Sequence, residues 1–369
     1  MREKAIIVSV YTGGNQDEFE YSIAELVRLI DTAGGEVVEH FTQNLKSPDP
    51  TSYIGSGKAA EISAYLQEHE DIQTVIFDNE LSPRQSNDLS TLFERKVIDR
   101  TEVILDIFAS RAQTREAKLE VELAQLEYLY PRLTHKWGHL SRQGGGIGTN
   151  GPGETQLEMD RRHIKDKVSI LKGRIKDVGR HREVVRQSRD KRGQKVVAIV
   201  GYTNSGKSTL LKALSKKEVY AKDQLFATLD PITRKVYLPT INKEILFSDT
   251  VGFIKNLPHH LVNSFKATLE EAVYADVLIH VVDAAATDIE RQIDTVLEVL
   301  SDLGAHENKK IITVFNKVDL NIHEPLDQLI ELYAPSLQTS ALKKEGLQEL
   351  LALVGESLYP PLAVAESLN

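Results

Sequence analysis

The stretch Gly201-Tyr202-Thr203-Asn204-Ser205-Gly206-Lys207-Ser208 decides the fold of the second half of the chain. An apolar run at 196–200 precedes it, and a helical pattern at 209–214 follows it. A strand, a glycine loop ending in Lys-Ser and a helix are typical of the phosphate-binding loop of nucleoside triphosphatases. The glycines allow a tight turn, so the loop amides and the helix N-terminus face the phosphates. The pattern predicts that Lys207 reaches the β- and γ-phosphates and that Ser208 binds Mg²⁺.

Two further motifs follow apolar runs that we interpret as strands. Asp249-Thr250-Val251-Gly252 follows 245–248, so Asp249 can hold Mg²⁺ through water and the Gly252 amide can meet the γ-phosphate. Asn316-Lys317-Val318-Asp319 follows 311–315. Asp319 can accept from N1–H and the exocyclic amine of guanine, which adenine lacks. A base that leaves such a buried acceptor without a donor is rejected by a factor of about 10⁴–10⁵, so the motif predicts GTP and not ATP as the substrate.

Two loops complete the predicted nucleotide site. A backbone amide of Ser340-Ala341-Leu342 is expected near guanine O6, and Phe226-Ala227-Thr228-Leu229-Asp230-Pro231 is the expected switch loop. Thr228 is the predicted second Mg²⁺ ligand, with Thr233 as its rival. The predicted nucleotide contacts are Gly201, Tyr202, Thr203, Asn204, Ser205, Gly206, Lys207, Ser208, Phe226, Ala227, Thr228, Leu229, Asp230, Asp249, Thr250, Val251, Gly252, Asn316, Lys317, Val318, Asp319, Ser340, Ala341 and Leu342.

Phe253 follows Gly252, where Ras-like enzymes place a glutamine that orients the attacking water. The predicted catalytic groups are Lys207 and Gly252. The chain itself supplies no glutamine to orient the attacking water. We expect slow intrinsic hydrolysis that a partner raises by about 10³–10⁵. Asn204 occupies a loop position where some GTPases hold K⁺, which gives a second hypothesis of K⁺ dependence.

The composition describes an ordinary globular chain of about two domains. Of its 369 residues 41% are hydrophobic and 27% charged, which is enough for a full core. No apolar run approaches the twenty residues of a membrane span, and the N-terminus lacks the apolar region of a signal peptide. Cysteine is absent, which excludes disulfides and thiolate metal sites. We expect a cytoplasmic monomer.

Strands and helices alternate over residues 1–100. The predicted strands are 4–10, 36–41, 74–77 and 97–98, and the predicted helices are 18–33, 57–69 and 82–95. Ser82 is the expected N-cap of the third helix, with Pro83 at its first position. This order predicts an open, mostly parallel α/β domain. Gly55-Ser56-Gly57-Lys58 is not a second phosphate loop, because Ser52 stands where a glycine is needed; it is either a loop with a helix start or a secondary nucleotide or RNA contact.

Residues 101–190 predict a long antiparallel helical hairpin. A helix from 101 to about 130, ended by Pro131, forms the first arm, and a stretch at 154–187 forms the second. Gly173 and Gly179 weaken the second arm by about 1 kcal/mol each and could kink it. The apolar positions of this arm follow a coiled-coil spacing: Leu157, Ile164, Val168, Leu171, Ile175, Val178 and Val185.

Residues 161–195 carry a net charge of +10, so the rest of the chain carries −19. This segment is either a solvated helix face or a contact for a polyanion. The glycine-rich loop 143–153 between the arms is either a flexible linker or an RNA-binding loop. The candidate RNA-binding residues are Arg142, Gln143, Gly144, Gly145, Gly146, Arg161, Arg162 and Lys165.

The alternation resumes after a predicted hinge at 188–195 and gives a second α/β domain over 191–360, with a short tail at 361–369. The predicted strands are 196–200, 235–239, 244–249, 276–282, 310–315 and 337–340. The predicted helices are 207–215, 259–272, 288–303 and 347–358.

With these residues assembled, the chain resembles the HflX family of translation-factor GTPases over nearly its whole length. The family-like stretches are YIGSGK (53–58), FDNEL (77–81), VIDRTEVILDIF (97–108), EVELAQL (120–126), GTNGPGETQLE (148–158), residues 201–209 and 226–231, and DTVGFI (249–254). The resemblance implies an N-terminal HflX domain beside a Ras-like P-loop GTPase domain. It also implies binding to the large (50S) ribosomal subunit and its rRNA, with the hairpin near the peptidyl-transferase region, and the splitting or rescue of stalled ribosomes.

Departures from the family pattern are few. Ser205 stands where alanine is common, Ile232 replaces a threonine, and the tail after residue 361 is short, so contacts of an additional C-terminal domain are not expected. Family members are also reported to bind ATP, which the NKVD motif does not explain. Two alternatives stay open: a nucleotide-switched scaffold that binds a partner helix through the coiled-coil seam, and an ATPase that acts on RNA structure.

Overall fold

The computed structural model describes residues 2–136, 152–215, 225–255, 266–305, 309–322 and 325–360. The chain divides into two compact units, Met1–Asp177 and Val178–Asn369. The division falls inside helix α6, whereas the hinge was expected at 188–195. The last turns of α6 group with the second unit because Arg182 and Arg186 contact Glu270 there.

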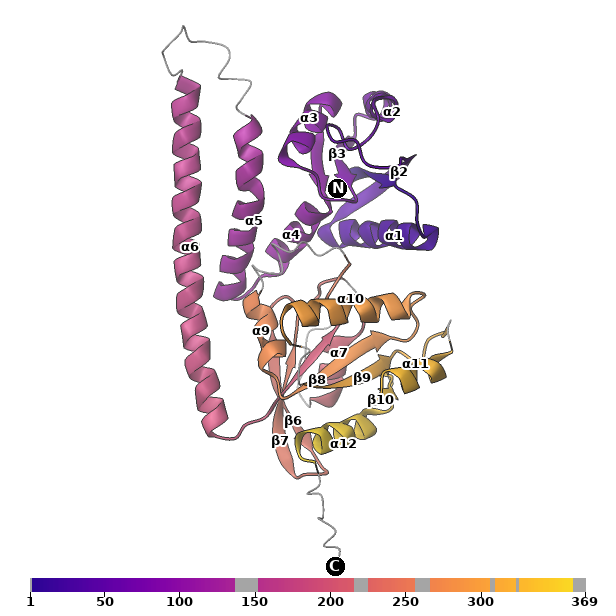
Figure 1. Cartoon of the computed structure of the whole chain (residues 1–369), viewed down its shortest axis with the longest axis vertical. Helices are drawn as coiled ribbons and strands as arrows, with labels where there is room; N and C mark the ends of the chain where they lie inside the picture. Colours follow the sequence, from indigo (N-terminus) through magenta and orange to yellow (C-terminus); the bar gives the residue numbers. More distant parts are fainter. Residues whose placement is uncertain are drawn as a thin grey trace, which may run out of the picture. The chain divides into compact units, whose positions relative to one another are not determined.

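The first unit holds a four-stranded sheet in the order β2-β1-β3-β4, and every neighbouring pair is parallel. The predicted parallel α/β arrangement is therefore confirmed (Figure 1). Apolar residues of α2 and α3 pack on one face of the sheet around Ile6, Val8 and Phe77, and β1 is buried along most of its length, as a central parallel strand must be. The elements are β1 Glu3–Tyr11, α1 Gln16–Ala33, β2 Gly35–Asn44, α2 Ser56–Glu68, β3 Ile72–Phe77, α3 Pro83–Phe93 and β4 Lys96–Asp99.

Local signals explain where these helices begin and end. The Asn15 side chain accepts from two amides of the first turn of α1, and Gly34 ends that helix with φ +94°. Ser82 and Gln85 form a capping box at the start of α3, with Pro83 in the first turn. In the Gly55–Lys58 stretch, Gly55 is the N-cap of α2 and the other three residues form the first turn of that helix.

The predicted single helix over 101–130 is wrong. The structure has two helices there, α4 Arg100–Arg111 and α5 Arg115–Lys136, separated by residues 112–114. Ala112 is extended and the Thr114 hydroxyl caps the amide of Ala117, which starts a new helix. Pro131 lies inside α5 and does not end it. The segment beyond Pro131 is held by Arg132, which donates to the carbonyl oxygens of Tyr128 and Leu81.

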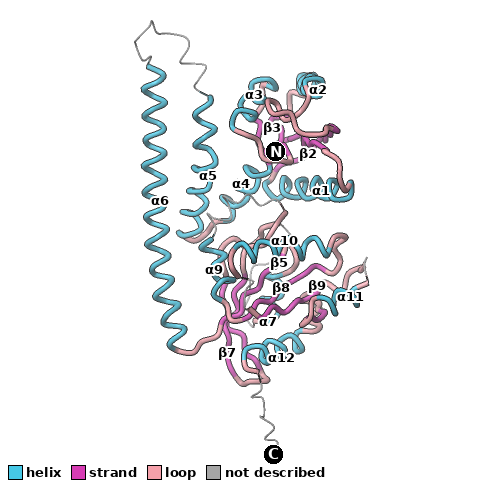
Figure 2. Tube along the Cα trace, viewed as in Figure 1, coloured by secondary structure: helices cyan, strands magenta, loops and turns pink. Residues whose placement is uncertain are grey.

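Helix α6, Pro152–Lys191, runs antiparallel to α5 (Figures 1 and 2). Within the first unit, Leu119, Leu123 and Leu126 of α5 form an apolar cluster with three residues of α6, Val168, Leu171 and Ile175. The ion pairs Lys167–Glu122 (2.6 Å) and Lys172–Glu127 (2.8 Å) join the two helices. Part of the predicted seam is therefore the hairpin's own interface. The helix is continuous through Gly173 and Gly179, and residues 137–151 with the glycine loop lie outside the described part.

The second unit is built on a six-stranded sheet in the order β10-β9-β8-β5-β7-β6, in which β6 is antiparallel to β7 and the other pairs are parallel. Helices α7 and α12 pack on one face, around Val236, Phe247 and Val314. The strands are β5 Val196–Gly201, β6 Ile232–Leu238, β7 Lys243–Asp249, β8 Val277–Asp283, β9 Lys310–Asn316 and β10 Ser336–Gln338. The helices are α7 Lys207–Leu214, α9 Lys266–Tyr274, α10 Ile289–Asp302, α11 Leu326–Leu332 and α12 Leu347–Leu358.

Two differences from the predicted elements concern this unit. Helix α11 was not predicted, because its seven residues are too short for a clear helical period. The helix expected at 259–272 is described only from Lys266 onward. Among the helices that the structure describes, none is long and apolar enough to cross a membrane.

Candidate nucleotide-binding site

Strand β5 ends at Gly201, and α7 begins at Lys207, so residues 202–206 form the loop between them. Two glycines are required by close contacts in this loop region. Gly206 has φ +96°, and a Cβ there would lie 2.3 Å from Nδ2 of Asn316. A Cβ on Gly252 would lie 2.9 Å from Cα of Thr203 and 3.0 Å from Nζ of Lys207. Gly252 therefore packs against the phosphate loop too closely for any side chain.

Lys207 is buried at the start of α7, with 6% of its surface exposed. Its Nζ donates to the carbonyl oxygens of Gly201 (3.1 Å) and Tyr202 (2.7 Å). Burial lowers the pKa of Lys207 to about 8, although Asp249 opposes the shift. The loop thus holds a buried ammonium group on neutral carbonyl oxygens, an arrangement that favours an incoming anion.

The three predicted metal ligands lie together. The Ser208 hydroxyl is 2.7 Å from the Thr228 hydroxyl and donates to Oδ2 of Asp249 at 2.6 Å. Burial raises the pKa of Asp249, while Lys207 and the hydroxyl hydrogen bonds oppose the rise. Oδ1 of Asp249 is buried and has no hydrogen-bond partner among the described residues. Thr233 lies elsewhere, because its hydroxyl pairs with Ser248 (3.2 Å) across the β6–β7 ladder.

The predicted switch segment covers this cluster. Phe226 has φ +51° and is buried, as are Thr228 and Leu229. The hollow between this segment and the phosphate loop has a volume of about 50 Å³. Lys207, Ser208 and Gly252 line this hollow, so it lies where the phosphates are expected.

The guanine side is organised by Asn316. Its Nδ2 donates to the carbonyl oxygen of Ser205 (3.0 Å), and its Oδ1 accepts from the amide of Ala341 (3.0 Å) and the hydroxyl of Thr339 (3.2 Å). One side chain therefore joins the phosphate loop to the 339–341 loop. Neither Thr339 nor its role was predicted from the sequence.

Lys317 and Asp319 flank Asn316 at the end of β9. Lys317 has φ +67°, and its Nζ donates to Oδ2 of Asp283 at 2.7 Å. Asp319 accepts from the Ser340 hydroxyl at 2.6 Å, and this hydrogen bond lowers the pKa of Asp319. Asp283 was not predicted, although its place at the end of β8 was the available signal.

Of the three amides predicted near guanine O6, two have partners within the chain. Ser340 donates to the carbonyl oxygen of Glu345 (3.2 Å), and Ala341 donates to Asn316. The Leu342 side chain is 77% exposed. The structure therefore brings Ser340 and Ala341 into the network around Asn316 and Asp319, and Leu342 lies at its solvent side.

Phe253 is apolar and fully buried. Its amide donates to the carbonyl oxygen of Gly201 (3.1 Å), and its own carbonyl oxygen accepts from the amide of Thr203 (2.7 Å). The residue after Gly252 is therefore part of the support of the phosphate loop. It has no group that could orient a water molecule.

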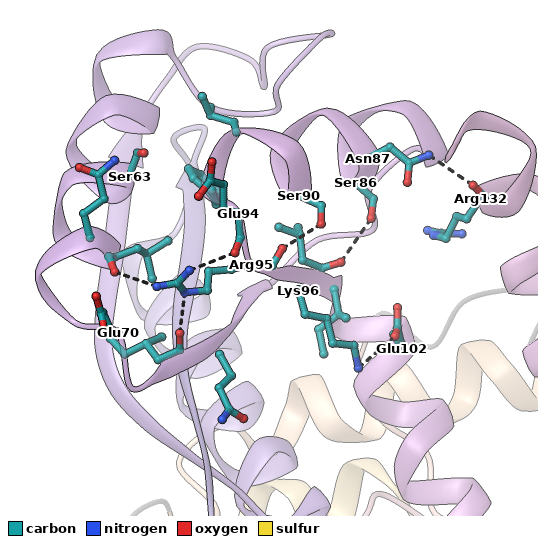
Figure 3. A pocket seen from close by; sticks show the side chains of 18 of the residues that line it. Ser63, Glu70, Ser86, Asn87, Ser90, Glu94, Arg95, Lys96, Glu102 and Arg132 are labelled. Carbon is teal, nitrogen blue, oxygen red and sulfur yellow. Dashed lines mark hydrogen bonds and ion pairs between the residues drawn. The ribbon is translucent and has the colours of Figure 1, made fainter. Parts of the chain in front are cut away.

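The first unit also has a cavity of about 1150 Å³ (Figure 3). Three charged side chains that line it, Arg95, Lys96 and Glu102, have partners within the chain. Arg95 donates to the carbonyl oxygens of Ile72 (2.8 Å) and Leu66 (3.2 Å), and Lys96 pairs with Glu102 (3.4 Å). The Ser86 hydroxyl donates to the carbonyl oxygen of Val97 in β4, and the Ser90 hydroxyl donates to that of Arg95, just before β4. These contacts hold the end of α3 and the edge strand β4, which is a structural role.

The predicted RNA-binding residues divide into two groups. Arg161, Arg162 and Lys165 are exposed on α6. The group from Arg142 to Gly146 lies outside the described residues.

The sheet order, the phosphate loop, the hydroxyl–carboxylate cluster and the NKVD loop together define a P-loop GTPase. The comparisons with known proteins agree. Residues 20–109 match the family "GTP-binding GTPase N-terminal", residues 111–189 match "GTP-binding GTPase Middle Region", and residues 196–317 match "50S ribosome-binding GTPase".

Similar proteins cover almost the whole chain. GTPase HflX of Lacrimispora saccharolytica is 49% identical over 358 residues, which are 96% of this chain and 82% of that protein. GTPase HflX of Escherichia coli K12 is 44% identical over 363 residues, 98% of this chain and 84% of that protein. A crystal structure of SsGBP with GDP is 28% identical, with a TM-score of 0.54 and coverage of 96% and 98%. The chain belongs to the HflX family of GTPases, which confirms the resemblance, the fold class and GTP hydrolysis as its activity.

Proposed function

We propose that this GTPase binds the large ribosomal subunit and its rRNA and splits or rescues stalled ribosomes. The observation that carries the proposal is the match of residues 196–317 to the family of 50S ribosome-binding GTPases. The +10 segment of residues 161–195 supports it, because exposed arginines and lysines on a long helix suit an RNA backbone. We further propose that the protein is a cytoplasmic monomer that is partly ribosome-associated.

We infer that the cofactor is Mg²⁺. Two hydroxyls and a carboxylate are the hard oxygen donors that this ion prefers, and the unpaired Oδ1 of Asp249 offers a further buried acceptor. Ser208 and Thr228 would hold the ion directly and Asp249 would hold it through water. When bound, the ion supplies positive charge that balances the β- and γ-phosphate oxygens.

The chain's own groups divide the remaining work. Lys207 exchanges its carbonyl partners for the β- and γ-phosphate oxygens, and the Gly252 amide donates to the γ-phosphate. Asp319 exchanges the Ser340 hydroxyl for the N1–H and amine of guanine. Because Phe253 cannot orient the attacking water, hydrolysis is slow until a partner supplies that group. Asn204, with φ +61° in the loop, is our candidate for a K⁺ contact; equal rates in K⁺ and Na⁺ would contradict it.

The alternative of a scaffold that binds a partner helix is disfavoured by packing. Val168, Leu171 and Ile175, the central residues of the seam, already pack on α5. ATP binding has no support in the geometry, since the base-recognition residues match guanine. ATP turnover that survives Asp319→Ala would favour the alternative of an ATPase.

Sedimentation with 50S subunits tests the proposal, in GTP, GDP, ATP and a non-hydrolysable GTP analogue. The variant Arg161→Gln/Arg162→Gln/Lys165→Gln removes three exposed charges from α6. If all three contact phosphates, the log–log salt slope falls by roughly 2–3, since each contact contributes about 0.7–0.9.

The matched control, Arg28→Gln/Lys46→Gln/Arg84→Gln, removes three exposed charges from the first unit away from α6. We expect its binding to equal that of the unmodified protein. Equal loss of binding in both variants would contradict a contact through α6, and absence of 50S binding by the unmodified protein would contradict the proposed function.

A further inference from the structure

Asp283 is the last residue of β8, and each oxygen of its carboxylate has a partner. Oδ1 accepts from the amide of Ala285 (3.0 Å), and Oδ2 accepts from Nζ of Lys317 (2.7 Å). The ion pair joins neighbouring strands, because Asp283 lies opposite Asn316 in the β8–β9 ladder. It is mostly shielded from solvent, since 20% of the Asp283 side chain and 24% of the Lys317 side chain are exposed.

Lys317 leaves the end of β9 in an unusual conformation. Its φ of +67° lies in the left-handed region, which residues other than glycine rarely adopt. Its side chain passes the phosphate loop, because Cε lies 4.0 Å from the position that a Cβ on Gly206 would take. The methylene stem therefore lies between the end of β9 and the phosphate loop, and the ammonium group is fixed on Asp283.

The nucleotide base has to lie close to this stem. In the proposed mechanism the phosphates contact Lys207 and the edge of the base contacts Asp319. Lys317 precedes Asp319 by two residues and its stem passes Gly206, so a base held between these two points lies beside the methylene groups. Lysine stems cover apolar surfaces while their ammonium group stays on a polar partner. A stem that is ordered before the ligand arrives favours binding, because less rotamer freedom is then lost.

We propose that Asp283 is a positioning residue for the nucleotide base, which acts by holding the stem of Lys317 against the face of the base. The contact adds affinity and does not select guanine, because all purines present a similar face. It is made equally in GTP, in GDP and in the transition state, so it contributes to binding and not to the rate. This role rests on the proposed contact between Asp319 and guanine, and not on ribosome binding.

Asp283→Asn tests this role. The new side chain keeps an oxygen for the Ala285 amide and lacks the charge that holds Lys317. We expect GDP affinity to fall by about fivefold to tenfold, and hydrolysis at saturating GTP to stay within about twofold of the unmodified protein. Inosine diphosphate lacks the exocyclic amine of guanine, so its affinity should fall by the same factor. Asp319→Ala should instead reduce the ratio between the two affinities.

Asp276→Asn is the matched control, because Asp276 stands just before the other end of β8 and has the same kinds of partner. It accepts from the amide of Val196 (2.8 Å) and from Nζ of Lys195 (2.6 Å). We expect this variant to leave GDP affinity unchanged. Lys317→Met keeps an apolar stem without the ammonium group, so Asp283→Asn should cause no further loss in the Lys317→Met background.

Equal GDP affinities of Asp283→Asn and Asp276→Asn would overturn the proposed role, as would additive losses in the Lys317→Met background. A loss that is larger for GDP than for inosine diphosphate would place Asp283 at the edge of the base and would also overturn it. A lower thermal midpoint, with affinity and rate falling together, would indicate a purely structural role. An unchanged affinity ratio in Asp319→Ala would contradict the proposed guanine contact, which is a separate result.

Discussion

Each unit of this chain buries a group of charges, and the two groups are built differently. In the first unit Arg100 pairs with Glu25 and with Asp78 (2.8 Å), and the Ser22 hydroxyl donates to Asp78 (2.8 Å). In the second unit Lys207 donates to backbone carbonyl oxygens, and Oδ1 of Asp249 is left without a described partner. Opposite charges in contact compensate one another's burial, so the loss of one partner is costly, whereas buried charges without a counter-charge in contact favour an outside ion. The first group therefore supports structure and the second binds ligand.

The largest expected effect lies in the first group. Arg100→Leu leaves Glu25 and Asp78 buried without a cation, which costs about 3–5 kcal/mol of folding free energy. Urea unfolding measures the loss. Because the two units have separate cores, nucleotide affinity of the protein that remains folded should stay the same, and a matching loss of GDP binding at low urea would contradict the division of roles.

Lys207 should behave in the opposite way. Lys207→Met removes a phosphate donor and should reduce the hydrolysis rate by about 10²–10³. Stability without nucleotide should not fall, because burial of the ammonium group is itself unfavourable. Single-turnover kinetics and urea unfolding on the same variant test both parts, and a loss of stability like that of Arg100→Leu would contradict the comparison.

The pH dependence sharpens the contrast. The pKa of Lys207 is lowered to about 8 from 10.5 in the free side chain. Between these two pH values the unfolded chain therefore binds more protons at this position than the folded chain does. Its contribution to stability therefore rises with pH from about 8 to 10.5. Nucleotide binding needs the charged form, so affinity should fall above pH 8, by up to about tenfold per pH unit. Lys207→Arg keeps its charge and should lack this fall; the same fall in Lys207→Arg would assign it to another group.

The smallest expected effect on stability comes from replacing one buried serine by alanine in each unit. Oγ of Ser205 is fully buried without a described partner, so Ser205→Ala should be neutral or stabilise the protein by about 1 kcal/mol. Ser22→Ala removes a buried donor to Asp78 and should destabilise by about 1–2 kcal/mol. The change in the free energy of unfolding, measured in urea, should differ between the two variants in sign or in size. Equal losses of stability would contradict the comparison.

The nucleotide site was largely predictable because its residues follow strand ends in chain order. Ser208, Thr228 and Asp249 come together, as the motifs required. Thr339 was missed because its hydroxyl acts through one contact, with Asn316, that no spacing reveals. Asp283 was missed although it ends a strand, because nothing in the sequence pairs it with Lys317. The same limit applies to the first unit, where the partners of Arg100 lie 75 and 22 residues away.

Helix boundaries were less predictable than the motifs. The break at 112–114 was missed because the apolar period continues across it, while the cap at Thr114 acts only locally. Pro131 was expected to end α5, yet the contacts of Arg132 hold one more turn. The end of α6 depends on Glu270 and Tyr274, which lie about eighty residues further along the chain.

The most direct test of the account is single-turnover GTP hydrolysis with and without purified 50S subunits. The buried Phe253 predicts a rate well below about 1 s⁻¹ alone and a rise of about 10³-fold or more when the subunit completes the site. A rate above about 1 s⁻¹ without any partner, or no rise with saturating 50S subunits, would contradict the central claim.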